Sequence, residues 1–170
     1  MNKFSKLNKK KFALKLNNKK YRIGLQINSR QLYFFYKLVN NLIIDGKKDK
    51  AIDILYNVIL ALDFYFKNKD PFFIIDKAIR RSILVVKIKK KRIAGRVHQV
   101  PLFLKRVNQI NYSLKSFVDC IRLRSEKTMV SKLLSEIKAI NERDFSAVVW
   151  RKKKTLYMQA ISNKFYVKYL

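Results

Sequence analysis

The spacing of apolar side chains changes along this chain, and the change restricts the folds open to it. From about residue 30 to residue 81, and again after residue 105, apolar residues recur every three to four positions, as on one face of a helix. In between, SILVVKIKKKRI and RVHQVPLFL are short, β-branched and separated by a tight turn. The pattern predicts a mainly α-helical protein with one projecting two-stranded β-hairpin at about 82–105.

Helical periodicity predicts a single domain at 30–170 with roughly five to six helices. Gly46 is expected to form the left-handed C-terminal cap of the first helix, and Asp49 the N-cap of the second. Asp70 followed by Pro71 predicts the start of a third, short helix. The expected helices lie at about 30–44, 50–67, 71–80, 108–124, 128–141 and 145–166.

The charge of the chain is strongly unbalanced. Lys and Arg number 40 against 11 Asp and Glu, and the formal net charge is +29 at pH 7. Self-repulsion of this size opposes a compact state, so a polyanionic partner is expected. A hydrophobic content of 49% argues against a wholly disordered basic tail. The partners to consider are nucleic acid and an anionic membrane surface.

Acidic residues are absent from two blocks, before Asp45 and between Asp76 and Asp119. An acid in the binding surface would repel a polyanion, so these blocks are expected to face the partner. The hairpin lies in the second block, and a stiff charged ribbon can contact phosphates on both sides of a groove. Alternatively its cations only keep an edge strand soluble, which would need one or two of them. The predicted binding residues of the hairpin are Lys87, Lys89, Lys90, Lys91, Arg92 and Arg96.

Residues 1–29 are rich in Lys and Asn and lack sustained periodicity. They are predicted to form an extended basic arm that becomes ordered on its partner. A targeting sequence is the weaker alternative, because such sequences favour Arg and Ser. On charge alone, the arm residues expected to bind are Lys9, Lys10 and Lys11.

A late basic run occupies the first half of the last predicted helix, where the macrodipole adds positive potential. The residues expected to face phosphate there are Arg151, Lys152 and Lys153. Two rings near basic residues could stack on RNA bases, but packing is the favoured interpretation for each. His98 is expected to pack within the hairpin, and Trp150 to anchor the last helix half-buried.

The sequence gives little support to catalysis. The chain has one histidine and one cysteine, so no cysteine-based or multi-histidine metal site is expected. It lacks the glycine-rich phosphate loops of nucleotide-binding proteins, and no cofactor is expected. Cys120 is predicted to be a buried free thiol. The chain is therefore not expected to be an enzyme.

Two blocks of sequence resemble the signatures of the family of small-subunit ribosomal protein seven. LVNNLIIDGKKDKAIDILYNVI, at 38–59, resembles a helix that ends in an Asp-Gly-Lys-Lys turn, followed by Ala and Tyr at fixed spacing. RIAGRVHQVP resembles a glycine turn that leads into Tyr-Gln-Val-Pro. Ala94 replaces the first glycine of that turn and His98 replaces the tyrosine. Both blocks lie in the family's order and separation.

The resemblance implies a structural protein that binds the 3′-major domain of small-subunit rRNA and organises the head of the subunit. It implies a hairpin near the exit-site tRNA and the mRNA path, neighbouring head proteins as partners, and no membrane. Residue by residue, it assigns rRNA contacts to Lys47, Lys48, Arg92, Arg96, Arg151 and Lys152.

Composition adds a clue to the origin of the gene. Lys, Asn, Ile, Phe and Tyr are abundant while Gly numbers 3 and Pro 2, as AT-rich codons would produce. With the resemblance, this favours a mitochondrially encoded protein, with a plastid or an AT-rich bacterium as alternatives.

The alternative function is an organellar nucleoid protein that binds nucleic acid without sequence preference. Such a coat needs charge but not two motifs in register. A membrane-surface protein is a weaker alternative, because these apolar stripes are expected to form one core.

Overall fold

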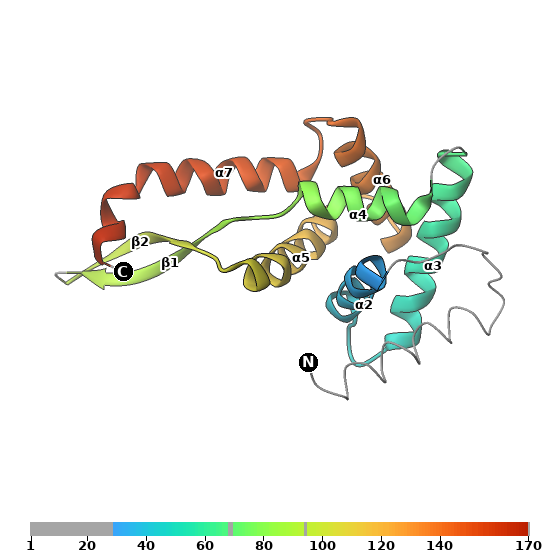
Figure 1. The fold of residues 1–170 in the computed structure, drawn as a ribbon, viewed down its shortest axis with the longest axis horizontal. Helices are drawn as coiled ribbons and strands as arrows, with labels where there is room; N and C mark the ends of the chain where they lie inside the picture. Colours follow the sequence, from blue (N-terminus) through green and yellow to red (C-terminus); the bar gives the residue numbers. More distant parts are fainter. Residues whose placement is uncertain (1–28, 68–69, 94, 170) are drawn as a thin grey trace. The chain divides into compact units, whose positions relative to one another are not determined.

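The computed structural model of the chain describes residues 29–67, 70–93 and 95–169, with side chains from residue 33 onward (Figure 1). Its elements confirm the predicted mainly helical fold with one antiparallel hairpin. In chain order they are α2 (Ser29–Leu42), α3 (Lys48–Tyr65), α4 (Pro71–Arg81), β1 (Val86–Ile93), β2 (Arg96–Phe103), α5 (Arg106–Arg122), α6 (Met129–Glu142), α7 (Val148–Ser162) and a 3-10 helix η1 (Lys164–Tyr169). The predicted arm, with Lys9, Lys10 and Lys11, lies outside the described side chains.

The chain divides into two compact units, with the boundary inside α4 between Asp76 and Lys77. In the first unit, α2 packs on α3 through apolar stripes. The rings of Phe35 on α2 and Phe72 on α4 meet edge to face, with centroids 4.8 Å apart. The buried residues of α3 are Ala51, Ile52, Leu55, Val58, Ile59 and Leu62, and Phe66, which follows the helix, is half-buried. The prediction of one domain at 30–170 stays a prediction.

The turn between α2 and α3 differs in detail from the predicted one. Asp45 and Gly46 both have left-handed backbone, with φ of 52° and 72°. The conformation predicted for Gly46 is therefore present, but α2 ends earlier, at Leu42. The backbone N–H of Lys47 then donates to the Ile44 carbonyl at 3.0 Å, which closes the turn and lets α3 begin at Lys48.

Two predicted N-caps have opposite outcomes. Asp49 is not the N-cap of α3, because the helix begins one residue before it. Its carboxylate lies instead in the first turn, where a negative charge favours the helix dipole. Asp70 is confirmed as the cap of α4, since its Oδ1 accepts the backbone N–H of Phe72 at 3.0 Å. Pro71 is the first helical residue, as predicted.

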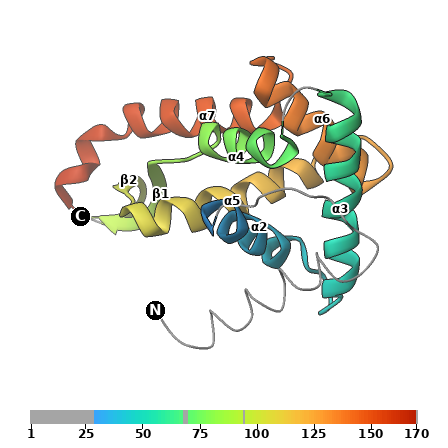
Figure 2. The ribbon, with the colours of Figure 1, turned by 45° about the vertical axis from the view of Figure 1, so that its right-hand side comes forward.

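The second unit contains the hairpin together with α5, α6 and α7 (Figure 2). Helix α5 packs against both α6 and α7, and α7 also runs along β1. The fully buried side chains that join these helices include Leu114, Phe117, Ile121, Leu133, Ile137 and Ile140. Cys120 is a free thiol only 1% exposed, as predicted. Burial raises the pKa of this thiol above its ordinary value, although the nearby charge of Lys152 opposes the shift.

Two predicted boundaries need correction. Residues 82–84 are not part of the ribbon, because the N–H of Leu84 donates to the Ser113 hydroxyl at 2.7 Å rather than to a partner strand. The Val85 carbonyl still accepts the Leu104 N–H at 2.9 Å, and β1 begins at Val86. The last predicted helix, 145–166, is shorter and interrupted. A turn at Asp144, whose carboxylate accepts the Ser146 N–H at 3.0 Å, delays the start of α7 to Val148. After Ser162 the chain continues as η1.

None of the helices in the described ranges is long and apolar enough to cross a membrane.

Candidate nucleic-acid interface

The hairpin places most of its cations in water. Lys89, Lys90, Lys91, Arg92 and Arg96 are exposed, whereas Lys87, nearer the base, is half-buried. Strand pairing runs without interruption from Val86↔Phe103 to Ile93↔Arg96, so the positions of these side chains are fixed by one register. Gly95, with φ of 81°, supplies the left-handed residue that the short turn requires.

The C-terminal segment lies against β2 (Figures 1 and 2). The ring of His98 packs on the ring of Tyr166 in η1, with centroids 4.3 Å apart. His98 is thus a packed residue, as expected, but it packs on η1 rather than within the hairpin. The ammonium of Lys91 donates a hydrogen bond to the backbone carbonyl of Tyr169. One predicted binding residue is thus also a contact within the protein.

The basic run of α7 contains side chains in two different environments. Arg151 and Lys154 are exposed, and Lys152 is half-buried. Lys153 is half-buried as well, and its amine donates to the carbonyl of Arg81 at 3.0 Å. Desolvation lowers the pKa of Lys153 from its ordinary value. Lys153, predicted to face phosphate, therefore holds α7 against the end of α4.

Arg81 joins this contact to a third helix. Its guanidinium donates to the last carbonyls of α6, those of Ile140 and Asn141, at 2.9 Å each. A cation at a helix C-terminus satisfies free carbonyls and favours the helix dipole. Trp150 is half-buried beside Lys153, with the Lys153 amine 5.9 Å from its ring centre. The predicted anchoring position of Trp150 is consistent with this packing.

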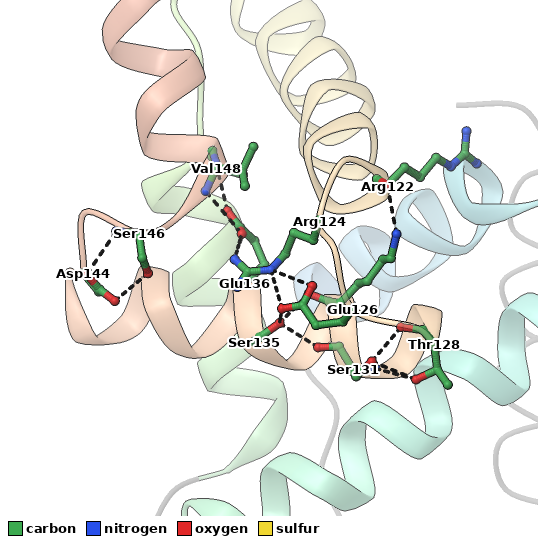
Figure 3. Close-up of polar contacts among 12 residues, drawn as sticks. Arg122, Arg124, Glu126, Thr128, Ser131, Ser135, Glu136, Asp144, Ser146 and Val148 are labelled. Atoms are coloured by element: carbon green, nitrogen blue, oxygen red, sulfur yellow. Dashed lines mark hydrogen bonds and ion pairs between the residues drawn. The ribbon is translucent and has the colours of Figure 1, made fainter.

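A buried carboxylate that the sequence analysis did not single out fixes the start of α7. Glu136 on α6 is 0% exposed and accepts the backbone N–H groups of Val148 and Val149 at 3.3 and 2.9 Å. It also forms an ion pair with Arg124 (Figure 3). A carboxylate at a helix N-terminus satisfies free N–H groups and favours the dipole. The signal in the sequence was an acid on the apolar stripe of Leu133, Ile137 and Ile140.

Arg124 bridges two acids, because its Nε also donates to Glu126 at 2.9 Å. Burial alone would lower the pKa of this guanidinium, but its hydrogen bonds to Glu136 and Glu126 outweigh that effect and raise it. The hydroxyl of Ser135 donates to Glu126 at 2.7 Å and lowers the pKa of that carboxyl (Figure 3). The charges of Arg124, Glu126 and Glu136 are therefore paired with one another within the protein.

The first unit carries the other predicted cations. Lys47 is exposed directly after the α2–α3 turn. Lys48 is half-buried, with its amine 5.4 Å from the centre of the Tyr36 ring. The backbone N–H groups of both residues donate within the turn at Asp45 and Gly46, which ties the Asp-Gly-Lys-Lys motif to a defined backbone shape.

Acids do not neutralise the hairpin. Across the described ranges, none of its cations is paired with a carboxylate, and the sequence from Lys77 to Val118 contains no acid at all. In the same ranges no group of three His, Cys, Asp or Glu side chains could hold a metal ion. The second unit thus presents uncompensated positive charge on two elements that pack together, the hairpin and α7.

Comparison with known proteins identifies the family. The model of the family "Ribosomal protein S7p/S5e" matches residues 6–164. The chain belongs to this family. Among its relatives are proteins named small ribosomal subunit protein uS7 from Marinomonas, Nitratiruptor and Campylobacter jejuni. Each is 31% identical over 133 or 134 residues, which is 78% of this chain and 83% or 84% of the relative.

Membership confirms the family inferred from the two sequence motifs. The chain is accordingly a small-subunit ribosomal protein, a structural component of the translation machinery and not an enzyme. Its uncompensated positive charge is what assembly beside a polyanion requires.

Proposed function

We propose that this protein binds small-subunit rRNA and organises the head, the 3′-major domain, with its hairpin near the exit-site tRNA and the mRNA path. The observation that carries this proposal is the row of exposed hairpin cations that no described carboxylate neutralises. In a protein of the small subunit, the polyanion within reach of such a row is RNA. Phosphate contacts of this kind position a protein on RNA and supply most of its affinity.

Two more sets of side chains extend the proposed surface. On α7, Arg151 and Lys152 lie in the first turns of the helix, where the macrodipole adds to their charge. After α2, Lys47 and Lys48 follow directly on the hydrogen-bonded turn at Asp45 and Gly46. Lys153 contributes less, because its amine is already bonded to Arg81. The arm cations Lys9, Lys10 and Lys11 are included in the proposed surface because of their charge alone.

The remaining parts of the proposal concern partners and location. Neighbouring proteins of the head are the protein partners, and the particle is a mitochondrial ribosome. The support for a mitochondrial origin is the bias toward Lys, Asn, Ile, Phe and Tyr with few Gly and Pro. Mass spectrometry of small subunits isolated from purified mitochondria tests this part. Peptides of the chain in the small-subunit fraction support it, and their restriction to plastid or bacterial ribosomes refutes it.

The central experiment is a filter-binding titration of the full chain. It compares a transcript of the 3′-major domain with duplex DNA and with an unrelated structured RNA, at two salt concentrations. The proposal predicts that the rRNA complex survives the higher salt while the other two dissociate. Equal loss of all three would mean that charge alone binds, which is the behaviour of a nonspecific nucleoid protein.

A further inference from the structure

The register of the hairpin sorts its cations onto two faces. Residues directly opposite each other in an antiparallel pair point to the same side, and successive residues alternate. Arg92 pairs with Val97 and Lys90 with Gln99, whereas Lys91 pairs with His98 and Lys89 with Val100. We call the side of Lys90, Arg92, Val97 and Gln99 the open face, and the side of Lys89, Lys91, His98 and Val100 the covered face.

The covered face meets the protein's own C-terminal segment at Lys91 and His98, whereas Lys89 on the same face is exposed. His98 packs on Tyr166, and the Lys91 ammonium donates to the Tyr169 carbonyl. Nearer the base both faces are buried, with Val100 on this side and Pro101 on the other, so the contacts with η1 are what distinguish this face near the tip. Both views show η1 beside β2 at this point (Figures 1 and 2). An RNA strand that approached this face would have to share it with η1.

The open face is accessible near the tip. Lys90, Arg92, Val97 and Gln99 are all exposed, and Val97 is 65% exposed. Arg92 donates a long hydrogen bond of 3.4 Å to the Gly95 carbonyl in its own turn. The face therefore combines two available charges with an amide and an apolar side chain.

We propose that the hairpin binds RNA through its open face, while η1 braces the covered face and keeps the ribbon in position. Lys90 and Arg92 contact phosphates, the Gln99 amide hydrogen-bonds a base edge, and Val97 packs on a base or ribose. This mixture suits an unpaired stretch of RNA, because base edges in the deep major groove of a regular RNA helix are out of reach of side chains. The inference rests on the rRNA-binding function proposed above.

Two double variants of the full chain test the assignment. Lys90→Ala with Arg92→Ala removes two charges from the open face, and Lys89→Ala with Lys91→Ala removes two from the covered face of the same strand. Binding to the 3′-major-domain transcript is measured across a salt series for each. The open-face variant is expected to bind the transcript roughly tenfold or more weakly than the unmodified protein. The slope of its affinity against salt concentration should fall by about one to two units. The affinity of the covered-face variant for the transcript is expected to fall by less than about threefold.

A neutral variant separates contact from charge. Gln99→Ala is expected to weaken rRNA binding with no change in the salt slope, since no phosphate contact is lost. Circular dichroism and thermal melting of all variants check that the hairpin and helices remain folded.

The outcomes distinguish this inference from the function on which it rests. Equal losses for the two pairs, or a larger loss for the covered-face pair, would overturn the assignment of faces. Wild-type affinity for both pairs would remove the hairpin from the interface. Either result leaves rRNA binding itself intact. Failure of the unmodified protein to prefer rRNA over duplex DNA would instead refute the proposed function.

Discussion

The carboxylate of Glu136 on α6 and the backbone N–H of Val149 on α7 are joined by a buried hydrogen bond of 2.9 Å. The same carboxylate binds Arg124, so a full negative charge is enclosed between a guanidinium and the start of a helix. The position of α7, and with it of Arg151 and Lys154, depends on this internal anion.

Replacing Glu136 with Gln is expected to destabilise the protein by about 3 kcal/mol, because Arg124 loses a charged partner in a buried site. Urea denaturation followed by circular dichroism measures the change. Glu142→Gln, an exposed acid on the same helix, is the matched control and should change stability by less than about 0.5 kcal/mol. A similar small effect for both variants would contradict a structural role for the buried pair.

The neighbours Lys153 and Lys154 are expected to respond differently to alanine. Lys153→Ala should cost about 1 kcal/mol of stability, because the Arg81 carbonyl loses its donor. Lys154 is exposed, so Lys154→Ala should leave stability unchanged. Thermal melting of the two variants measures the difference. Finding the stability loss at Lys154 instead would show that the two environments are wrongly assigned.

Capping of α4 gives a prediction with an internal control. Asp70→Ala should destabilise the protein by about 1 kcal/mol, since the N–H of Phe72 loses its acceptor. Asp70→Asn keeps an acceptor of similar length and should stay within about 0.5 kcal/mol of the unmodified chain. Denaturation midpoints of the three proteins test this order. Equal effects of the two substitutions would mean that the carboxylate charge, not the cap, matters.

Cys120 is expected to resist alkylation in the folded protein. Burial both hides the sulfur and raises its pKa, so at neutral pH the reactive thiolate is rarer than for a free cysteine. Iodoacetamide labelling followed by mass spectrometry should show little modification at pH 7 and complete modification in denaturant. Raising the pH should increase the rate, because the thiolate fraction grows. Rapid labelling of the native protein at pH 7 would contradict the buried position.

The sequence predicted the features that depend only on residues adjacent in the chain. The Asp70-Pro71 start of α4 and the alternation in the hairpin follow from backbone preferences and spacing alone. It misplaced Asp49 as a cap, because the turn at Asp45 and Gly46 closes one residue sooner than the spacing implied. The helix predicted at 145–166 begins later, at Val148, for a similar reason. Asp144 forms a local turn with Ser146, and the spacing of apolar residues does not reveal such a turn.

The sequence by itself determined the mainly helical fold, the hairpin, the family motifs and the concentration of positive charge, since each is written in short-range spacing or in composition. Only the tertiary structure decided what each cation does. It bonds Lys91 to η1 and Lys153 to Arg81, leaves Lys90 and Arg92 open, and encloses Glu136 beneath α7. These differences arise because burial and hydrogen bonding depend on residues far apart in the chain, and a lysine's charge looks the same in sequence whether its amine faces solvent or a carbonyl.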